Sequence, residues 1–263
     1  YFNLSLISEN YFKNNNLDLA KKFLIKFDKK NKIYYWYKVK KMEKIIAKKE
    51  NEKNSLKYIE NKFKELKNPT NKIFFDMGNI YKSHKKFNKA IEYYSKVLKN
   101  IDKNSTSYAD ILFRRGICYE RLEEFKKSDE DLIKSLNINP DDPYVLNYLA
   151  YSWLERNYKI DEAMEMLKSA YKQKENDPYI IDSIGWGYYL TGDYISAEKY
   201  MQKAVMLMPD DPIVNDHYGD ILWRLNRKIQ AQFFWKSVLD LEEAKKQMKE
   251  KISLKLLKGL KKI

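Results

Sequence analysis

The stretch IIDSIGWGYYLTGDYISAEKYMQKAVMLMP, residues 180–209, contains the pattern that decides the fold. Small residues, among them Gly185, Ala197 and Ala204, recur between large apolar residues at helical spacing. Small side chains let two helices approach closely, and large ones fill the space between them. Gly192 separates the two helical patterns, where a glycine can adopt a positive φ and reverse the chain. The stretch therefore predicts a helical hairpin.

This hairpin pattern recurs along almost the whole chain. Self-comparison places seven copies in register, with residues 8, 43, 78, 116, 150, 185 and 219 at equivalent positions. Two degenerate copies occupy residues 1–70, and five clearer copies occupy residues 71–242. One of the five clearer copies matches the pattern only if its turn, near residues 157–160, contains one extra residue. A regular period near 34 residues predicts a repeat architecture in which neighbouring hairpins bury each other's apolar faces.

The prolines mark the junctions between copies and interrupt no helical pattern. In three junctions the proline follows an aspartate, which can cap the free amides while proline takes the first helical position. The six prolines are Pro69, Pro140, Pro143, Pro178, Pro209 and Pro212. The sequence therefore predicts helix starts after Asp142, Asp177 and Asp211.

We number each copy so that the equivalent residues given above, from 8 to 219, are position 8. The small and large residues then fall at consensus positions 4, 7, 8, 11, 20, 24, 27 and 32. In this respect the sequence resembles the tetratricopeptide-repeat family. The resemblance implies an all-α fold, a right-handed α-solenoid of helix-turn-helix repeats that binds other proteins. Residues 146–224 also resemble a group of exported bacterial members, some of them outer-membrane lipoproteins. That narrower resemblance implies a periplasmic or outer-membrane-associated scaffold, with a lipid-attachment cysteine upstream of Tyr1. A cytoplasmic location is the alternative.

Residues 243–263 carry a separate apolar stripe. Met248, Ile252, Leu256 and Leu260 recur every four residues among lysines, which predicts one amphipathic helix. A solenoid needs such a helix to cover its last apolar face, so we favour a C-terminal capping helix. The alternative is a basic amphipathic helix lying on an anionic membrane.

The formal net charge of +14 suggests a nucleic-acid or anionic-membrane binder at first sight. The charge is concentrated, because residues 1–108 carry 26 basic and 11 acidic residues. Lysine dominates over arginine, whereas base and phosphate recognition favours arginine. Enrichment in residues with AT-rich codons also explains the lysines, so we expect nucleic acid not to be the partner. Binding to nucleic acid or to an anionic membrane surface remains the alternative function.

Catalytic chemistry has few candidates in this sequence. His84 and His217 lie in different copies, and neither has a second ligand at metal-binding spacing. Cys118 falls at a packing position, where a buried thiol is expected. No stretch is long and apolar enough to span a bilayer. We therefore expect a non-catalytic protein without cofactor or metal, in contact with a membrane only peripherally if at all.

The family resemblance also predicts a binding groove lined by the first helix of each pair. Positions 2, 5, 9, 12 and 13 point into that groove in the family. In this sequence they supply an aromatic and acidic set, namely Tyr144, Asn147, Tyr151, Tyr179, Asp182, Trp186, Tyr189, Asp216, Asp220, Trp223 and Arg224. Tyrosine, tryptophan and arginine are the residues that most often anchor protein interfaces. The predicted function is a scaffold that binds a protein or peptide segment, although some of these aromatics can pack between repeats instead.

Overall fold

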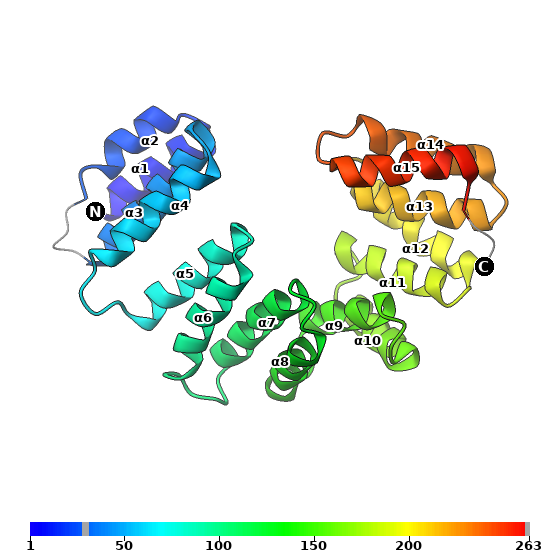
Figure 1. Ribbon diagram of the computed structural model, residues 1–263, viewed down its shortest axis with the longest axis horizontal. Coiled ribbons are helices and arrows are strands. Elements are labelled where there is room, and N and C mark those ends of the chain that lie inside the picture. Colours follow the sequence, from blue (N-terminus) through cyan, green and yellow to red (C-terminus); the bar gives the residue numbers. More distant parts are fainter. Residues whose placement is uncertain (28–31, 261–263) are drawn as a thin grey trace. The chain divides into compact units, whose positions relative to one another are not determined.

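The structure, a computed structural model, describes residues 1–27 and 32–260. These residues form 15 helices and no strand (Figure 1). Consecutive helices pack in pairs, as in α1 with α2, α5 with α6, and α11 with α12. The predicted all-helical fold of paired helices is thereby confirmed. Among these helices, none combines the length and apolarity that crossing a bilayer requires.

The chain divides into two compact units. Unit 1 comprises residues 1–128 and unit 2 residues 129–263, with the division inside α8 (Phe125–Ile138). Unit 1 contains α1 (Phe2–Lys13), α2 (Leu17–Leu24), α3 (Lys32–Lys49), α4 (Glu52–Lys64), α5 (Asn71–Ser83), α6 (Phe87–Leu98) and α7 (Thr106–Glu120). Unit 2 contains α9 (Pro143–Glu155), α10 (Ile160–Gln173), α11 (Pro178–Leu190), α12 (Tyr194–Leu207), α13 (Pro212–Arg224), α14 (Lys228–Asp240) and α15 (Lys246–Lys258). The division at residues 70 and 242, which rests on closeness to the consensus, stays a prediction.

The turn inside a pair has the same backbone conformation in six of the seven copies. Repeat position 15 has a positive φ in each of these six copies, as Asn15, Lys85, Glu123, Asn157, Gly192 and Asn226. The next amide donates to the carbonyl oxygen five residues earlier, as from Asp193 to Tyr188 at 2.9 Å. This closure is the Schellman motif, which ends a helix by satisfying its last carbonyl groups. The positive φ predicted for Gly192 is confirmed, and a second left-handed residue, Lys159, lies where an extra residue was expected.

The junctions between pairs begin as the aspartate-proline pattern predicts. The Asp177 carboxylate accepts hydrogen bonds from the amides of Tyr179 at 3.1 Å and Ile180 at 3.3 Å. Asp142 and Asp211 make the equivalent pair of bonds, and a proline occupies the first turn in all three helices. These caps satisfy amides that have no partner within the helix. Each cap also holds in place the backbone of the second and third residues after the aspartate.

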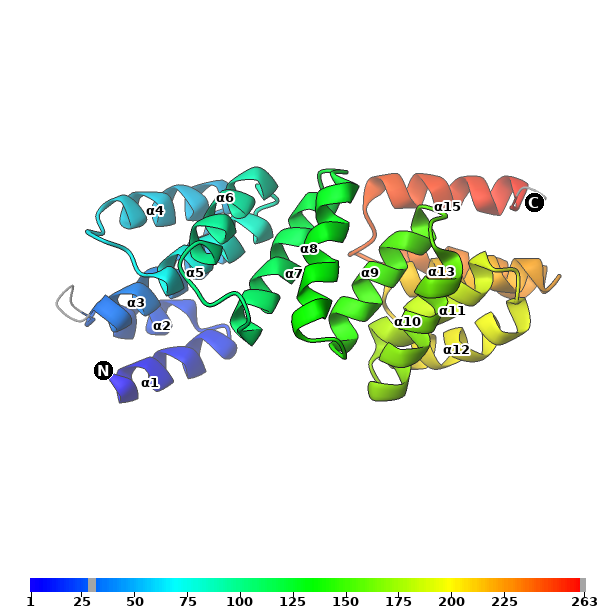
Figure 2. The same ribbon diagram turned by 90° about the horizontal axis from the view of Figure 1, so that it is seen from below.

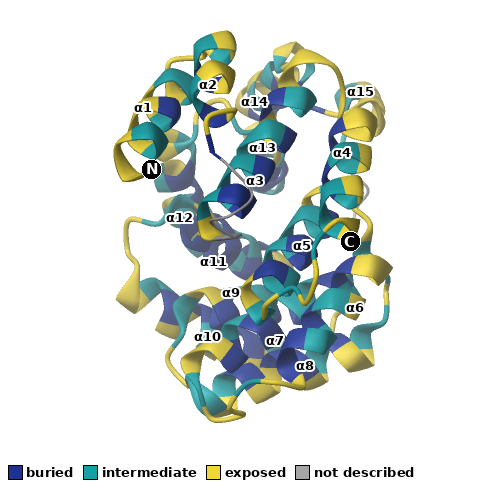
Figure 3. Cartoon of the chain, turned by 90° about the vertical axis from the view of Figure 1, so that its left-hand side faces the viewer, coloured by how far each residue is buried: buried dark blue, intermediate teal, exposed yellow. Residues whose placement is uncertain are grey.

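The core lies between the two helices of each pair, and Figure 3 marks the buried residues along the helices in dark blue. Position 20 is always alanine or serine, and position 24 is always large. Both are 0% exposed in every copy, position 20 as Ala20, Ser55, Ala90, Ser128, Ala163, Ala197 and Ala231, and position 24 as Leu24, Ile59, Tyr94, Leu132, Leu167, Met201 and Trp235. The phasing of all seven copies, including the two degenerate ones, therefore matches the buried positions.

The C-terminal helix α15 packs against α14 and bonds to α13 through Lys255 (Figure 1; Figure 2 gives a second view of α15). Its residue Ile252 is 0% exposed, and Met248, Leu256 and Leu260 pack on the same core cluster as Trp235. The predicted apolar stripe thus faces the last helix pair. Leu254 and Leu257 lie on the exposed side of α15.

We predict that Gly219→Ala destabilises the protein. An added Cβ would overlap the indole ring of Trp235, which is 0% exposed and has no room to move. Overpacking strain of roughly 3 kcal/mol then exceeds the ~1 kcal/mol that alanine contributes to helix propensity.

Gly185→Ala is the matched control, because it occupies the same position one copy earlier. Its nearest side-chain neighbour is the flexible tip of Met201, at 3.2 Å from the added Cβ. Thermal and urea unfolding should show a lower midpoint for Gly219→Ala only. Equal midpoints in both variants would contradict this account of the core.

Candidate functional site

The predicted groove residues all lie in unit 2, on the first helices of three successive pairs. Tyr144, Asn147 and Tyr151 are on α9. Residues 179–189 of the set are on α11 and residues 216–224 on α13. α11 contacts both α9 and α13, so the three helices form one continuous face. The structure therefore brings the predicted residues together on neighbouring helices, but it exposes them very unequally.

Two of the predicted residues are largely exposed. Tyr144 is 49% exposed and Tyr179 is 66% exposed, both at repeat position 2 in the first turn of a helix. Ile213, at the same position in the next copy, is 51% exposed, although sequence reasoning left it out of the set. Its position in the copy was the signal that could have identified it. We call Tyr144, Tyr179 and Ile213 the position-2 row.

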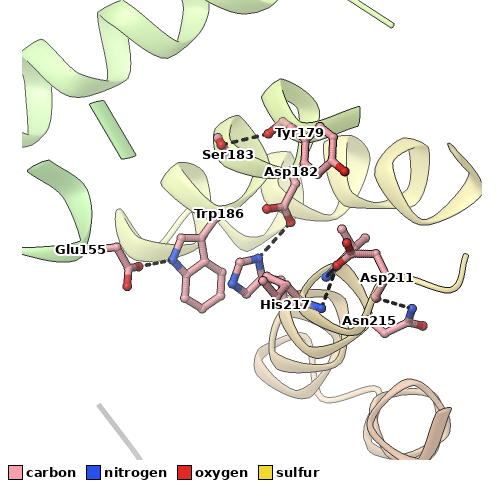
Figure 4. A network of polar contacts seen from close by, with 10 residues as sticks. Glu155, Tyr179, Asp182, Ser183, Trp186, Asp211, Asn215 and His217 are labelled. Atoms are coloured by element: carbon pink, nitrogen blue, oxygen red, sulfur yellow. Dashed lines mark hydrogen bonds and ion pairs between the residues drawn. The ribbon is translucent and has the colours of Figure 1, made fainter. Parts of the chain in front are cut away.

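Trp186 is the centre of an aromatic stack in the middle of this face. Its indole ring lies against the His217 ring, with centroids 3.9 Å apart, and against Tyr189 at 4.5 Å. The indole Nε1 donates to Glu155 at 2.7 Å (Figure 4). Trp186 is therefore half-buried and fixed by contacts from α9 and α13, with one ring edge tied to a carboxylate.

A buried ion pair joins α11 to α13 beneath this stack. His217 Nδ1 lies 2.9 Å from Asp182 Oδ1, and both side chains are buried (Figure 4). Burial alone would lower the pKa of His217, but the Asp182 charge and hydrogen bond, helped by Asp216 and Asp220, outweigh it and raise the pKa. The imidazole is thus held in its charged form over a wider pH range than usual, inside the protein.

A second buried ionic contact joins α13 to the C-terminal helix. Lys255 on α15 contacts Asp216 and lies 2.6 Å and 2.8 Å from the two carboxylate oxygens of Asp220. Asp220 also accepts a hydrogen bond from the Trp235 indole at 3.0 Å. Burial alone would lower the pKa of Lys255, but the Asp220 and Asp216 carboxylates raise it. Lys255 therefore stays charged at neutral pH.

The end of α15 also covers Trp223. Gly259, with a φ of +67°, approaches the Trp223 indole so closely that any Cβ would overlap it. Trp223 also packs on Trp235, with ring centroids 5.2 Å apart. Arg224, the last predicted residue, hydrogen-bonds Tyr189. These residues stabilise the end of unit 2 rather than project from it.

Of the residues predicted to line the groove, the structure buries several between repeats, an alternative that the sequence left open for the aromatics. Asp182 is 8% exposed, Tyr189 9% and Asp220 6%. They are buried because the next first helix packs against positions 5, 9 and 12, which the resemblance assigned to the groove. Asn147, Tyr151, Trp186 and Asp216 are intermediate, and the position-2 row remains accessible. Binding of a partner by this face stays a prediction.

The contacts that bury these residues follow a rule that sequence reasoning missed. In four copies, position 6 of a first helix reaches back to position 5 or 9 of the preceding one. These contacts are Lys41 with Glu9, Asp76 with Lys40, Arg114 with Asn79, and His217 with Asp182. Ser183, at position 6 of α11, instead bonds to Tyr179 in its own helix. Lys255 of α15, which follows the seven copies, reaches back in the same way to Asp216 and Asp220. Helix α15 thus contacts α13 as the first helix of a further repeat would. Residues of opposite charge or complementary polarity about one repeat length apart were the sequence signal that could have predicted these contacts.

Comparison with known proteins agrees with this geometry. A family model described as "Tetratricopeptide repeat" matches residues 72–104 and 109–142. A "TPR repeat-containing protein" of Pseudomonas aeruginosa is 31% identical over 111 residues, which are 42% of this chain and 19% of that protein. The human "Protein O-mannosyl-transferase TMTC1" is 25% identical over 115 residues, 43% of this chain and 13% of that protein. The matched residues thus span under a fifth of either relative.

Solved structures show the same fold at low sequence identity. A thermophilic TPR protein of Thermus thermophilus superposes with a TM-score of 0.60 at 16% identity, covering 72% of this chain and 100% of that one. Pseudomonas aeruginosa pilF superposes with a TM-score of 0.59 at 19% identity, covering 72% and 83%. At these identities the likeness establishes the fold alone.

We predict that Asp182→Asn lowers the pKa of His217 relative to the unsubstituted protein, because burial is then less opposed by charge. The interactions that raise this pKa stabilise the folded protein when His217 is charged. Their contribution to the free energy of unfolding is complete below about pH 6.5, the ordinary histidine pKa, and is lost as pH rises through the pKa of His217 in the folded protein. Nuclear magnetic resonance titration of the imidazole measures the shift. Glu155→Gln, which changes the Trp186 contact but not the ion pair, should leave it unchanged. An unaltered titration in Asp182→Asn would refute the assignment.

We predict that Lys255→Ala loosens α15 from unit 2. Removing one partner of a buried ion pair leaves the Asp220 carboxylate unpaired, at a cost of roughly 3 kcal/mol. Hydrogen exchange of α13 and α15 amides should therefore accelerate by about two orders of magnitude. Lys251→Ala removes an exposed lysine from the same helix and should leave exchange unchanged. Equal exchange in the two variants would show that the ionic contact does not hold α15.

Proposed function

We propose that this tetratricopeptide-repeat protein is a non-catalytic scaffold that binds a segment of a partner protein on the first-helix face of unit 2. The observation that carries the proposal is the position-2 row. It consists of large, exposed, apolar side chains at one equivalent site in three successive copies. Exposed apolar groups arranged in a row, rather than scattered singly, are typical of interaction surfaces.

The row is also rigid, which favours binding. The backbone amides of Tyr144, Tyr179 and Ile213 each donate to the capping aspartate of their helix, at 3.0, 3.1 and 2.8 Å. Because the backbone of this chain is already ordered at these residues, binding costs it less conformational entropy than flexible anchors would. Tyrosine also keeps a hydroxyl group for hydrogen bonding after its ring is buried.

The polar surroundings indicate the chemistry of the partner. Residues 109–242 carry 24 acidic and 17 basic residues, and Glu155 lies beside the central Trp186. A segment with apolar side chains at repeat spacing and basic residues between them would complement this face. The finer proposal, a partner in a cell-envelope complex, rests on the likeness of residues 146–224 to exported bacterial repeats.

The absence of catalytic activity is part of the proposal. His217 is buried in its ion pair, and burial raises the pKa of Cys118 to about 11, which leaves the thiol protonated at neutral pH. His84 is bonded to Glu43 at 3.1 Å. Within residues 1–27 and 32–260, no three histidine, cysteine or acidic side chains gather as a metal site would require. These observations favour a binding role over chemistry.

The test compares two triple variants of the full chain. Tyr144→Ser, Tyr179→Ser and Ile213→Ser together remove the position-2 row. Ile195→Ser, Ile229→Ser and Phe233→Ser remove three apolar residues of second helices that are at least as exposed as the position-2 row. Because exposed side chains contribute little to folding, both proteins should unfold like the unsubstituted one.

We predict that recovery of crosslinked partners from source cells falls at least tenfold with the first variant and is unchanged with the second. Anchors of this kind commonly contribute more than 1–2 kcal/mol each, roughly tenfold in affinity. Quantitative mass spectrometry measures the recovery. Equal recovery by both variants would reject this face. Salt-dependent retention on anionic vesicles or DNA by all three proteins would support the alternative function instead.

A further inference from the structure

Unit 1 contains a cavity that the proposed function does not use. It has a volume of about 580 Å³ and lies between α1, the start of α3, and the connection from α4 to α5. Residues of a run of aromatics in α3, Tyr34 to Tyr37, line it together with Pro69 and Ile73. A volume of this size is in the range of about 300–1,000 Å³ that is typical of ligand sites.

The walls of this cavity are apolar because their polar atoms already have partners. The Trp36 indole donates to Asp76 at 2.9 Å, and the Tyr37 hydroxyl lies 3.2 Å from Glu9. The Tyr35 hydroxyl donates to Glu65 at 3.4 Å. What these residues offer to the cavity is therefore ring surface, which favours a large apolar group.

The rim of the cavity is basic. Lys40, Lys67 and Lys72 are among the lining residues, and Lys67 and Lys72 are exposed. Glu65 is the single carboxylate among the lining residues, and it is bonded to Lys62 at 2.5 Å. The rim lies in the part of the chain with 26 basic and 11 acidic residues, so the surrounding field also attracts negative charge.

We propose that this cavity binds a partner-protein segment in which an aromatic or large aliphatic side chain is flanked by aspartate or glutamate. The apolar side chain enters the cavity, and the flanking carboxylates meet Lys67 and Lys72. The basic groups lie on the exposed rim, and the polar atoms of Tyr35, Trp36 and Tyr37 are turned to protein partners. This arrangement suits a chain that continues past the opening better than a small molecule, which needs buried polar groups to fix its orientation.

This site is independent of the position-2 row, because it lies in unit 1 and requires the opposite charge in its partner. The acidic segment expected here differs from the basic segment expected on unit 2. Either site can therefore fail its test without affecting the other.

The experiment uses the full chain and a fluorescein-labelled peptide in which one phenylalanine is flanked on each side by two aspartates. Fluorescence anisotropy at low salt measures binding to three proteins: unsubstituted, Lys67→Glu with Lys72→Glu, and Lys53→Glu with Lys57→Glu. The last pair is the matched control, because it changes the net charge equally on exposed lysines of α4 outside the cavity. Circular dichroism verifies that each variant is folded.

We predict that the rim variant weakens binding at least tenfold and that the control changes it less than threefold. Replacing the peptide's phenylalanine by alanine should also weaken binding at least tenfold. A peptide with photoreactive benzoylphenylalanine at that position should crosslink to α3 or to the start of α5.

Several results would overturn the proposal. Equal weakening by the rim and control variants would mean that only net charge matters. Equal affinity for the alanine peptide or for a lysine-flanked peptide would exclude the cavity as the anchor site. Binding of 2-naphthoate as tight as that of the peptide would identify a small organic acid as the ligand class. Absence of binding by the aspartate-flanked peptide would reject the site.

Discussion

The contact between positions 8 and 24 is the constraint on which the structure depends. Position 24 is fully buried in all seven copies, and its side chain lies against position 8 of the facing helix where both can be traced. The sizes compensate each other. Trp235 faces Gly219, Tyr94 faces Gly78, and Met201 faces Gly185. Because interiors are packed to crystal-like density, an aromatic ring at position 24, as in Tyr94 and Trp235, leaves no room for a side chain at position 8. This requirement sets the distance between the helices of a pair.

Once that distance is fixed, the next helix has a defined place to pack, and its polar residues determine which surfaces remain accessible. At four junctions position 6 reaches back to position 5 or 9, and the bonded residue types differ from one of these junctions to the next. A His217–Asp182 pair joins α11 to α13, and Lys255 between two aspartates joins α13 to α15. Buried ionic contacts contribute modestly to net stability but penalise a wrong neighbour, because an unpaired buried charge is costly. Different pairs at successive junctions therefore favour the native order of helices.

The sequence was sufficient for the fold because its signals were local and periodic. Glycines, alanines and serines at fixed spacing identified the paired helices, and Asp177-Pro178 located a helix start to the residue. The face was harder to predict, because exposure depends on the following helix as well as on the helix that carries the residue. Tyr189 and Asp220 occupy positions that the family resemblance assigned to the groove, yet they are buried and bond to Arg224 of α13 and Lys255 of α15. Ile213 shows the converse, since it was not among the predicted groove residues but lies exposed in the first turn. The cavity of unit 1 could not be predicted from any one motif, because three separate segments of the chain form its walls.

The two candidate sites differ in the physical basis of their recognition. On unit 2 the exposed residues follow capping aspartates, so the helix starts that stabilise the fold also hold the position-2 row in place. Their neighbours are acidic, and their apolar groups stand out from the surface. In unit 1 the apolar surface is recessed between helices, and lysines on the rim supply the charge. A protruding row selects a partner by the spacing of its contacts, whereas a recessed cavity selects by the size of one side chain. Repeats with a common core can therefore present unrelated binding chemistry, because the residues that fix the helix pair and those that face a partner occupy different positions of the copy.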